Sequence, residues 1–166
     1  MLLLGARTGS STGRNLWTTR RGICADAEDV LRALTEPGEI AEWAPVSFAV
    51  DGLAGGALQT GSHERVSGSI AGIGATFEIE VSHADVERLE LVARGPVTLE
   101  VSYRFHQREQ DVLVEATVGL RRSRGLAAQI LGAAVAALLD AGALGSALRR
   151  LEIAVAAPVG TELIAV

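Results

Sequence analysis

The sequence predicts an α+β fold in which a curved antiparallel sheet of about six or seven strands is closed by a long C-terminal helix. Two observations carry this prediction. Segments of alternating apolar and polar residues follow one another from residue 77 to residue 121. A stretch from Gly125 to Ala157 is apolar almost throughout and reads as one helix. Two short helices are expected between the first and second strands.

The first strand is expected over residues 16–25, and the two short helices follow it. Asp26 is suited to cap the first helix, whose apolar residues recur at helical spacing over residues 27–34. Pro37 can begin the second helix, since its missing N–H would be unpaired in the first turn anyway. That helix must end by Ala44, because the residue before a proline is pushed out of the α region.

The remaining strands are read from alternation and turn residues. A short strand over residues 48–50 precedes an Asp-Gly turn, and residues 58–66 form a further candidate strand before a glycine-punctuated stretch. Four alternating segments then describe an antiparallel meander with one apolar and one polar face. These segments are 77–82, 88–94, 97–106 and 112–121.

The terminal helix is expected to cover the apolar face of the meander. The predicted inward stripe has three-to-four spacing and consists of Leu126, Ile130, Ala133, Ala137, Leu144, Leu148, Leu151 and Val155. Glycines in this helix either leave room for a ligand or mark a kink over residues 142–145. Asp140 lies near the middle of the apolar stretch, which favours a buried helix over a membrane span.

The bulk composition fits one domain. The chain has 166 residues, and we expect a flexible arm over residues 1–15, a ligand-binding domain over 16–157 and a tail over 158–166. A net charge of −5 and an aromatic content of 4% argue against a nucleic-acid partner. Four arginines precede Asp26, and they indicate a solvated arm more than a lipid contact. The lone Cys24 excludes an internal disulfide, and a cytoplasmic location is expected.

The order of these elements resembles the START-like helix-grip (SRPBCC) superfamily, in particular its polyketide cyclase/dehydrase and lipid-transport group. The resemblance covers residues 16–157 and rests on Ile23-x-Ala25, Val30, Leu34, Ile40-x-x-Trp43-x-Pro45, Gly61, Gly95-Pro96, Tyr103-Arg104-Phe105 and the last helix. It implies a deep cavity between sheet and helix that accepts a hydrophobic small molecule. A fold of this kind supports many chemistries, so it does not select one.

Two residues are candidate catalytic groups. If residues 58 and 66 face inward, Ser62 and Glu64 do so too, and a carboxyl group in an apolar cavity suits general acid or base work. A bulge near Gly61 would reverse this and turn Glu64 outward. Tyr103 lies on the apolar face of its strand, where its hydroxyl could hold or protonate a ligand or could reach water at the strand end.

The other residues expected to touch a ligand are mostly apolar, and Trp43 is expected to act as a gate or a structural residue. They are Trp43, Ser62, Phe77, Ile79, Leu91, Val101, Phe105, Ile130, Ala134 and Leu138. The three histidines lack metal-ligand spacing, so no metal and no cofactor are expected.

The resemblance thus implies a binder of a polyketide, lipid or quinone, either an enzyme that catalyses cyclisation or dehydration or, alternatively, a non-catalytic carrier or sensor. Stable membrane insertion is not expected. The oligomeric state is left open.

Overall fold

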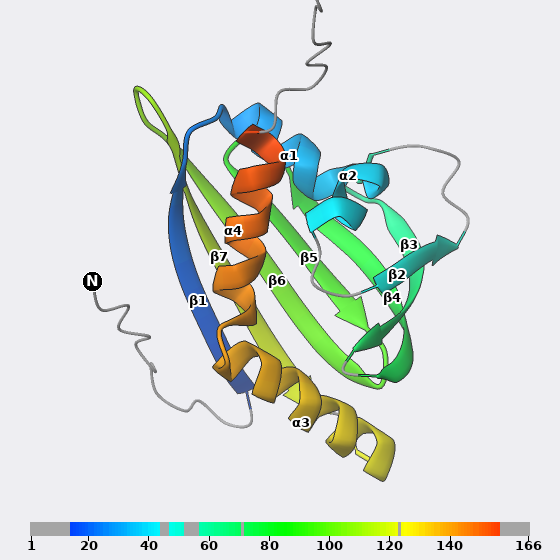
Figure 1. The fold of residues 1–166 in the computed structure, drawn as a ribbon. Helices are drawn as coiled ribbons and strands as arrows, with labels where there is room; N and C mark the ends of the chain where they lie inside the picture. The colour runs from blue at the N-terminus through cyan, green and yellow to red at the C-terminus, as the bar shows by residue number, and fades with distance from the viewer. Residues whose placement is uncertain (1–13, 44–46, 52–56, 71, 123, 157–166) are drawn as a thin grey trace, which may run out of the picture.

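A computed structural model describes residues 14–43, 47–51, 57–70, 72–122 and 124–156, and it confirms the predicted α+β class (Figure 1). The described residues form seven strands and four helices. In chain order these are β1 (Arg14–Ile23), α1 (Ala27–Thr35), α2 (Pro37–Trp43), β2 (Ser47–Asp51), β3 (His63–Ile70), β4 (Ile73–Ala84), β5 (Arg88–Arg94), β6 (Val97–Gln107), β7 (Val112–Arg122), α3 (Leu126–Asp140) and α4 (Ala143–Ala156).

The strands form one antiparallel sheet in the order β1-β7-β6-β5-β4-β3-β2. Figure 1 shows that the sheet is strongly curved and that the helices lie on its concave side. The four predicted alternating segments correspond to β4 to β7. Each of these strands presents its apolar residues to the helices and its charged residues to solvent. A register shift between Val81 and His83 adds to the bend of β4.

Several details of the first half differ from the prediction, including the first strand, which spans Arg14–Ile23 rather than residues 16–25. The third strand begins at His63 rather than at residue 58, because Gly61 has a φ of 88° and the chain turns there. The strand then runs through the glycine-punctuated stretch to Ile70, since pairing with β4 holds it extended. Asp26 precedes α1 but makes no capping hydrogen bond with its side chain. The predicted arm and tail lie outside the described residues, except that β1 already includes Arg14 and Asn15.

The expected single terminal helix is two helices. α3 and α4 meet at an angle of 62°, and Gly142 between them has a φ of 92°, a conformation that favours glycine. The kink considered at residues 142–145 is therefore a full break. Within the described residues no single helix is long and apolar enough to cross a bilayer, and the α3–α4 pair reaches that length and composition only across its bend.

The break changes which face of α3 is buried. The expected stripe is wrong over α3, because Leu126, Ile130, Ala133 and Ala137 are exposed while Leu131 and Val135 are buried. Helix α3 has apolar residues on all sides, so periodicity alone could not identify its inner face. Over α4 the stripe holds for its three leucines. They are Leu144, Leu148 and Leu151, and all of them are buried.

Buried side chains gather into two clusters at opposite ends of the concave face. One cluster lies under α1 and α4 and includes Ile23, Val30, Leu34, Val81, Leu89, Tyr103, Phe105, Val112, Val114, Leu148 and Leu151. The other lies under α3 and consists of Phe77, Ala93, Val97, Leu120, Leu131, Val135 and Ala136. Each half of the broken helix therefore covers one end of the sheet.

Candidate functional site

Between the two clusters, the concave face carries a strip of aliphatic side chains that are only half-buried. This concave strip consists of Ile79, Leu91, Leu99 and Val101. The register makes it continuous, because Leu91 is opposite Val101 and Ala93 lies between Ile79 and Leu99. Inward apolar residues normally lose nearly all of their exposure in a packed core. These four side chains pack against the two clusters and yet stay half-buried, so the helices cover the concave face less completely here than at either end.

Glu64 borders the concave strip on the β3 side. Its register partner is Ile79, and its neighbours on the same face of β3 are half-buried, whereas His63 and Arg65 are exposed on the other face. Arg65 pairs there with Glu78, with 2.8 Å between Nε and Oε1. The open question of register is thus resolved in favour of an inward, half-buried Glu64.

Tyr103 borders the strip on the α1–α4 side, two residues beyond Val101 on β6. Its side chain is 8% exposed, and burial raises the pKa of its hydroxyl to about 12. This hydroxyl makes no hydrogen bond to another described residue, and its oxygen is not fully enclosed. At neutral pH the group is protonated, so it can donate a hydrogen bond to a ligand but cannot serve as a base.

Glu64 and Tyr103 are far apart on the sheet. Glu64 lies in the same cross-strand row as Leu99, which is three strands away and four residues before Tyr103 on β6. With about 4.8 Å between strands and about 3.3 Å per residue, the two side chains start roughly 20 Å apart on a flattened sheet. They therefore border the concave strip at opposite corners.

The other predicted ligand residues are divided between the interior and the surface. Phe77 and Phe105 are buried, one in each cluster, and Ala134 is half-buried. Ile130 is 52% exposed and Leu138 37% exposed, so neither faces the sheet as expected. The exposure of Ile130 and Leu138 accompanies the break between α3 and α4.

Ser62 and Trp43 also differ from the simple expectation. The Ser62 hydroxyl accepts a hydrogen bond from the Gln59 N–H at 2.8 Å, which stabilises the turn before β3. Trp43 is the last residue of α2, and its side chain lies outside the described part of the structure.

An open hollow of about 1150 Å³ lies at the end of the sheet where α1 begins, a place that the sequence reading did not single out. Most of its lining residues are polar or charged, and they come from the start of α1, the β4–β5 turn with the adjoining strand ends, and β6 with the β6–β7 turn. The lining residues are Asp26, Ala27, Glu28, His83, Asp85, Val86, Glu87, Arg88, Arg104, Phe105, His106, Gln107, Arg108 and Glu109. This hollow is not the expected cavity between the sheet and the terminal helix.

The β4–β5 turn beside this hollow is fixed by Asp85. Its carboxylate accepts hydrogen bonds from the N–H groups of Glu87 and Arg88 and from His83 Nε2 at 2.5 Å. The Glu87 N–H and then the His83 side chain hold the pKa of Asp85 below its usual range. Arg88 Nη2 lies 3.4 Å from the other ring nitrogen of His83. Both ring nitrogens of His83 thus contact residues of the β4–β5 turn, and the side chain stabilises that turn.

Among the described residues, no three His, Cys, Asp or Glu side chains are grouped as they would be around a metal ion. His63 lies near Glu78 on the convex face, His83 in the turn, and His106 is exposed on β6. The three histidines therefore lie apart from one another.

No protein-family model matches the chain, and no curated protein matches it either. Solved structures do. A Rhodobacter sphaeroides protein superposes with a TM-score of 0.63 at 20% identity, over 92% of this chain and 99% of that one. Ara h 8.0201 gives a TM-score of 0.58 at 10% identity, over 86% of this chain and 98% of that one.

DynU16, from the dynemicin biosynthetic locus, gives a TM-score of 0.52 at 22% identity. The match covers 82% of this chain and 47% of DynU16, so the chain spans about half the length of that protein. At these identities the likeness concerns the fold alone. Together with the curved sheet, the two short helices after β1 and the C-terminal helices, it shows that the chain has a helix-grip fold.

Proposed function

We propose that the protein binds an elongated, mainly apolar small molecule along the concave strip. The observation that supports this most directly is the strip itself, four inward aliphatic side chains that remain half-buried between two packed clusters. Apolar area removed from water contributes about 25 cal/mol per Å², so a ligand that covers these side chains gains affinity from a surface already shaped to receive it.

The polar groups at the two corners of the strip support an extended ligand rather than a compact one. A chain-like molecule lying on Leu91 and Val101 would have Tyr103 near one end and Glu64 toward the other. The protonated Tyr103 hydroxyl is suited to donate a hydrogen bond to a carbonyl oxygen. Polyketide chains carry spaced carbonyl groups, and fatty acyl chains combine apolar length with one terminal carbonyl group.

The catalytic form of the proposal is a cyclisation or dehydration of a poly-β-ketone chain. Glu64 would transfer the proton, while Tyr103 would hold a carbonyl oxygen at a distance and fix the folding of the chain. The fold likeness to DynU16, a protein from a biosynthetic locus, adds support for a role in the synthesis of natural products.

Binding is tested by filling the strip. In Leu91→Phe the larger ring occupies space on the concave strip, and we expect the Kd for the fluorescent acyl probe cis-parinaric acid to rise at least tenfold. The matched control is Val92→Phe, because Val92 is the next residue on β5, half-buried on the convex face. Its Kd should remain within about twofold of wild type. Equal Kd values in all three proteins would refute binding on the strip.

Catalysis is tested separately with a synthetic poly-β-ketone thioester. Glu64→Gln keeps the size of the side chain but removes the titratable group, and we expect turnover to fall by about 10²-fold or more. Tyr103→Phe should mainly raise KM, since it removes one hydrogen bond to the bound chain. Normal turnover in Glu64→Gln would exclude the proton-transfer role, and binding without any product would favour a carrier.

A further inference from the structure

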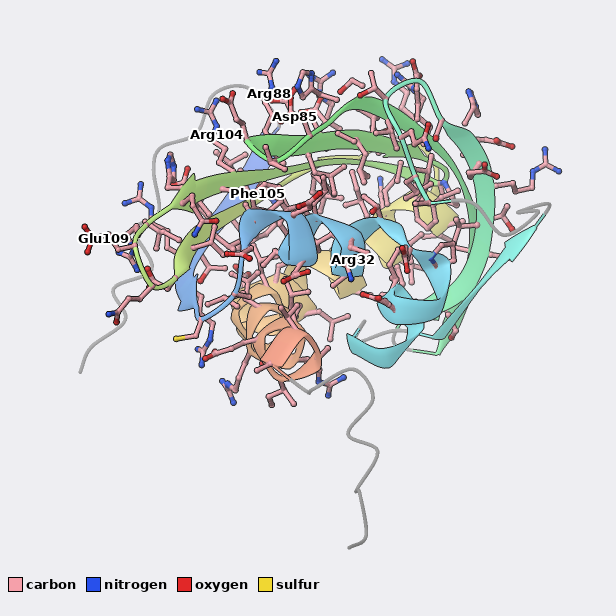
Figure 2. All side chains as sticks on the ribbon, turned by 90° about the horizontal axis from the view of Figure 1, so that it is seen from above. Arg32, Asp85, Arg88, Arg104, Phe105 and Glu109 are labelled. Atoms are coloured by element: carbon pink, nitrogen blue, oxygen red, sulfur yellow. The ribbon has the colours of Figure 1, made fainter. Side chains whose placement is uncertain are left out.

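Two arginines stand opposite each other on the convex face of the sheet. Arg88 on β5 and Arg104 on β6 are register partners, and both are exposed. Figure 2 shows both side chains on the outer side of the sheet, away from the helices. Directly opposed residues have Cβ atoms about 5 Å apart, and like charges at that separation destabilise the strand pair. An anion between the two guanidinium groups would remove that repulsion.

Arg104 has no acidic partner among the described residues. Its other register partner is Glu115, but the Glu115 carboxylate is held by Arg20. The Arg88 side chain forms an ion pair with Glu90, with 3.6 Å between Nη1 and Oε1, and its Nη2 lies 3.4 Å from His83 Nδ1.

Elsewhere on the convex face the arginines are neutralised. Arg65 and Arg94 each have a glutamate oxygen at 2.8 Å, from Glu78 and Glu80 respectively. Among these described arginines Arg104 is therefore the exception, and Arg88 beside it has only a 3.6 Å ion pair with Glu90.

Both arginines line the hollow at the end of the sheet, which gives a ligand room to approach them. The other charged or titratable groups of the hollow are Asp26, Glu28, His83, Asp85, Glu87, His106, Arg108 and Glu109. Asp85 is already bound by His83 and two backbone N–H groups, and Arg108 is bound by Asp111. In Figure 2, Glu109 lies to the side of the arginine pair. The surrounding acids repel a long polyanion. The ligand that fits is therefore an anion small enough to contact the two arginines alone.

We propose that Arg88 and Arg104 together bind the phosphate group of a small molecule. The planar guanidinium fork donates two parallel hydrogen bonds to an oxyanion, and two forks can serve three phosphate oxygens. A carboxylate has only two oxygens and would occupy the pair less completely. The site is on the opposite face of the sheet from the concave strip, so this proposal is independent of the proposed function.

The site is tested with inorganic phosphate and phenyl phosphate as probes, measured by titration calorimetry at low ionic strength. We expect Arg104→Gln and Arg88→Gln each to weaken phosphate binding at least tenfold. Arg104→Lys keeps the charge without the fork, and it should recover only part of the affinity. The control is Arg94→Gln, an arginine of the same face whose charge is already paired, and it should bind phosphate within about twofold of wild type.

Thermal unfolding gives a second readout. Phosphate should raise the Tm of the wild type and of Arg94→Gln, and it should leave the Tm of Arg104→Gln unchanged. Equal loss of phosphate binding in Arg94→Gln and Arg104→Gln would overturn the site, because the effect would then reflect net charge. Tighter binding of a short DNA oligonucleotide than of phenyl phosphate would overturn the small-molecule assignment. Binding of cis-parinaric acid should be unaffected by Arg104→Gln, so failure of this proposal is distinguishable from failure of the proposed function.

Discussion

The two faces of the sheet are built from alternate residues of the same strands, yet they are stabilised in different ways. The concave face is aliphatic and is covered at both ends by helices. The convex face carries several cross-strand ion pairs, such as Arg65 with Glu78 and Arg94 with Glu80. Tyr103 on the concave face and Arg104 on the convex face are two polar side chains without a hydrogen-bond or ion-pair partner among the described residues. Both candidate sites lie at these exceptions.

The largest difference between the faces should appear in the free energy of unfolding. Leu89 is 1% exposed on the concave face, and Leu89→Ala should destabilise the protein by about 3 kcal/mol through lost burial and the cavity left behind. Glu90 is the next residue and faces solvent, so Glu90→Ala should change stability by less than about 1 kcal/mol. Urea denaturation measures both, and comparable losses would contradict the division of the sheet into a packed and a solvated face.

Alkaline titration sharpens the comparison for the buried tyrosine. Tyr103 is the single tyrosine of the chain, so absorbance at 295 nm reports its ionisation without interference. Its pKa is raised to about 12 by burial, whereas an unfolded tyrosine titrates near 10. Between these pH values the folded state keeps the proton that the unfolded state releases, so stability must fall as the pH rises.

The expected loss between pH 9.5 and 11.5 is about 2 kcal/mol in the wild type, beyond any loss in Tyr103→Phe. Urea denaturation of the two proteins at both pH values measures the difference. An ordinary titration near pH 10 would show that the hydroxyl is in contact with water.

The smallest effect is expected on the convex face. Arg65→Gln removes an exposed ion pair with Glu78, and exposed pairs of this kind contribute about 0.2–1 kcal/mol. The loss should shrink further in 1 M salt, where the Debye length is about 3 Å. A loss above 2 kcal/mol, or one that persists in high salt, would mean that the convex ion pairs hold the sheet together more than the packing does.

The sequence located the strands well where one face of a strand is exposed to solvent and the other is buried. Alternation located β4 to β7 within a few residues, and it placed Tyr103 and Phe105 on the inner face. It did not identify the buried face of an element that has no polar residues on its exposed face. Helix α3 has no charged residue before Asp140, so Ile130 and Leu138 could not be distinguished from Leu131 and Val135.

The arginine pair was within reach of the sequence. Arg94 and Thr98 flank the Gly95-Pro96 turn as register partners, and counting outward from that turn brings Arg88 opposite Arg104. The position of Glu64 needed the structure, because it depends on the turn at Gly61 and on pairing with β4. The hollow needed it as well, since three segments distant in the sequence line it.

The break at Gly142 also solves a problem of length. As one straight rod, residues 126–156 would extend about 46 Å, whereas the 12 residues of β4 extend about 40 Å. A continuous helix of that length would run past the end of the sheet. The 62° bend instead directs α3 and α4 across different parts of the sheet, so that one segment serves as two separate covers. The space between those covers is therefore set by backbone geometry at a single glycine, and a residue with a side chain at that position would alter the dimensions of the interior without touching its lining.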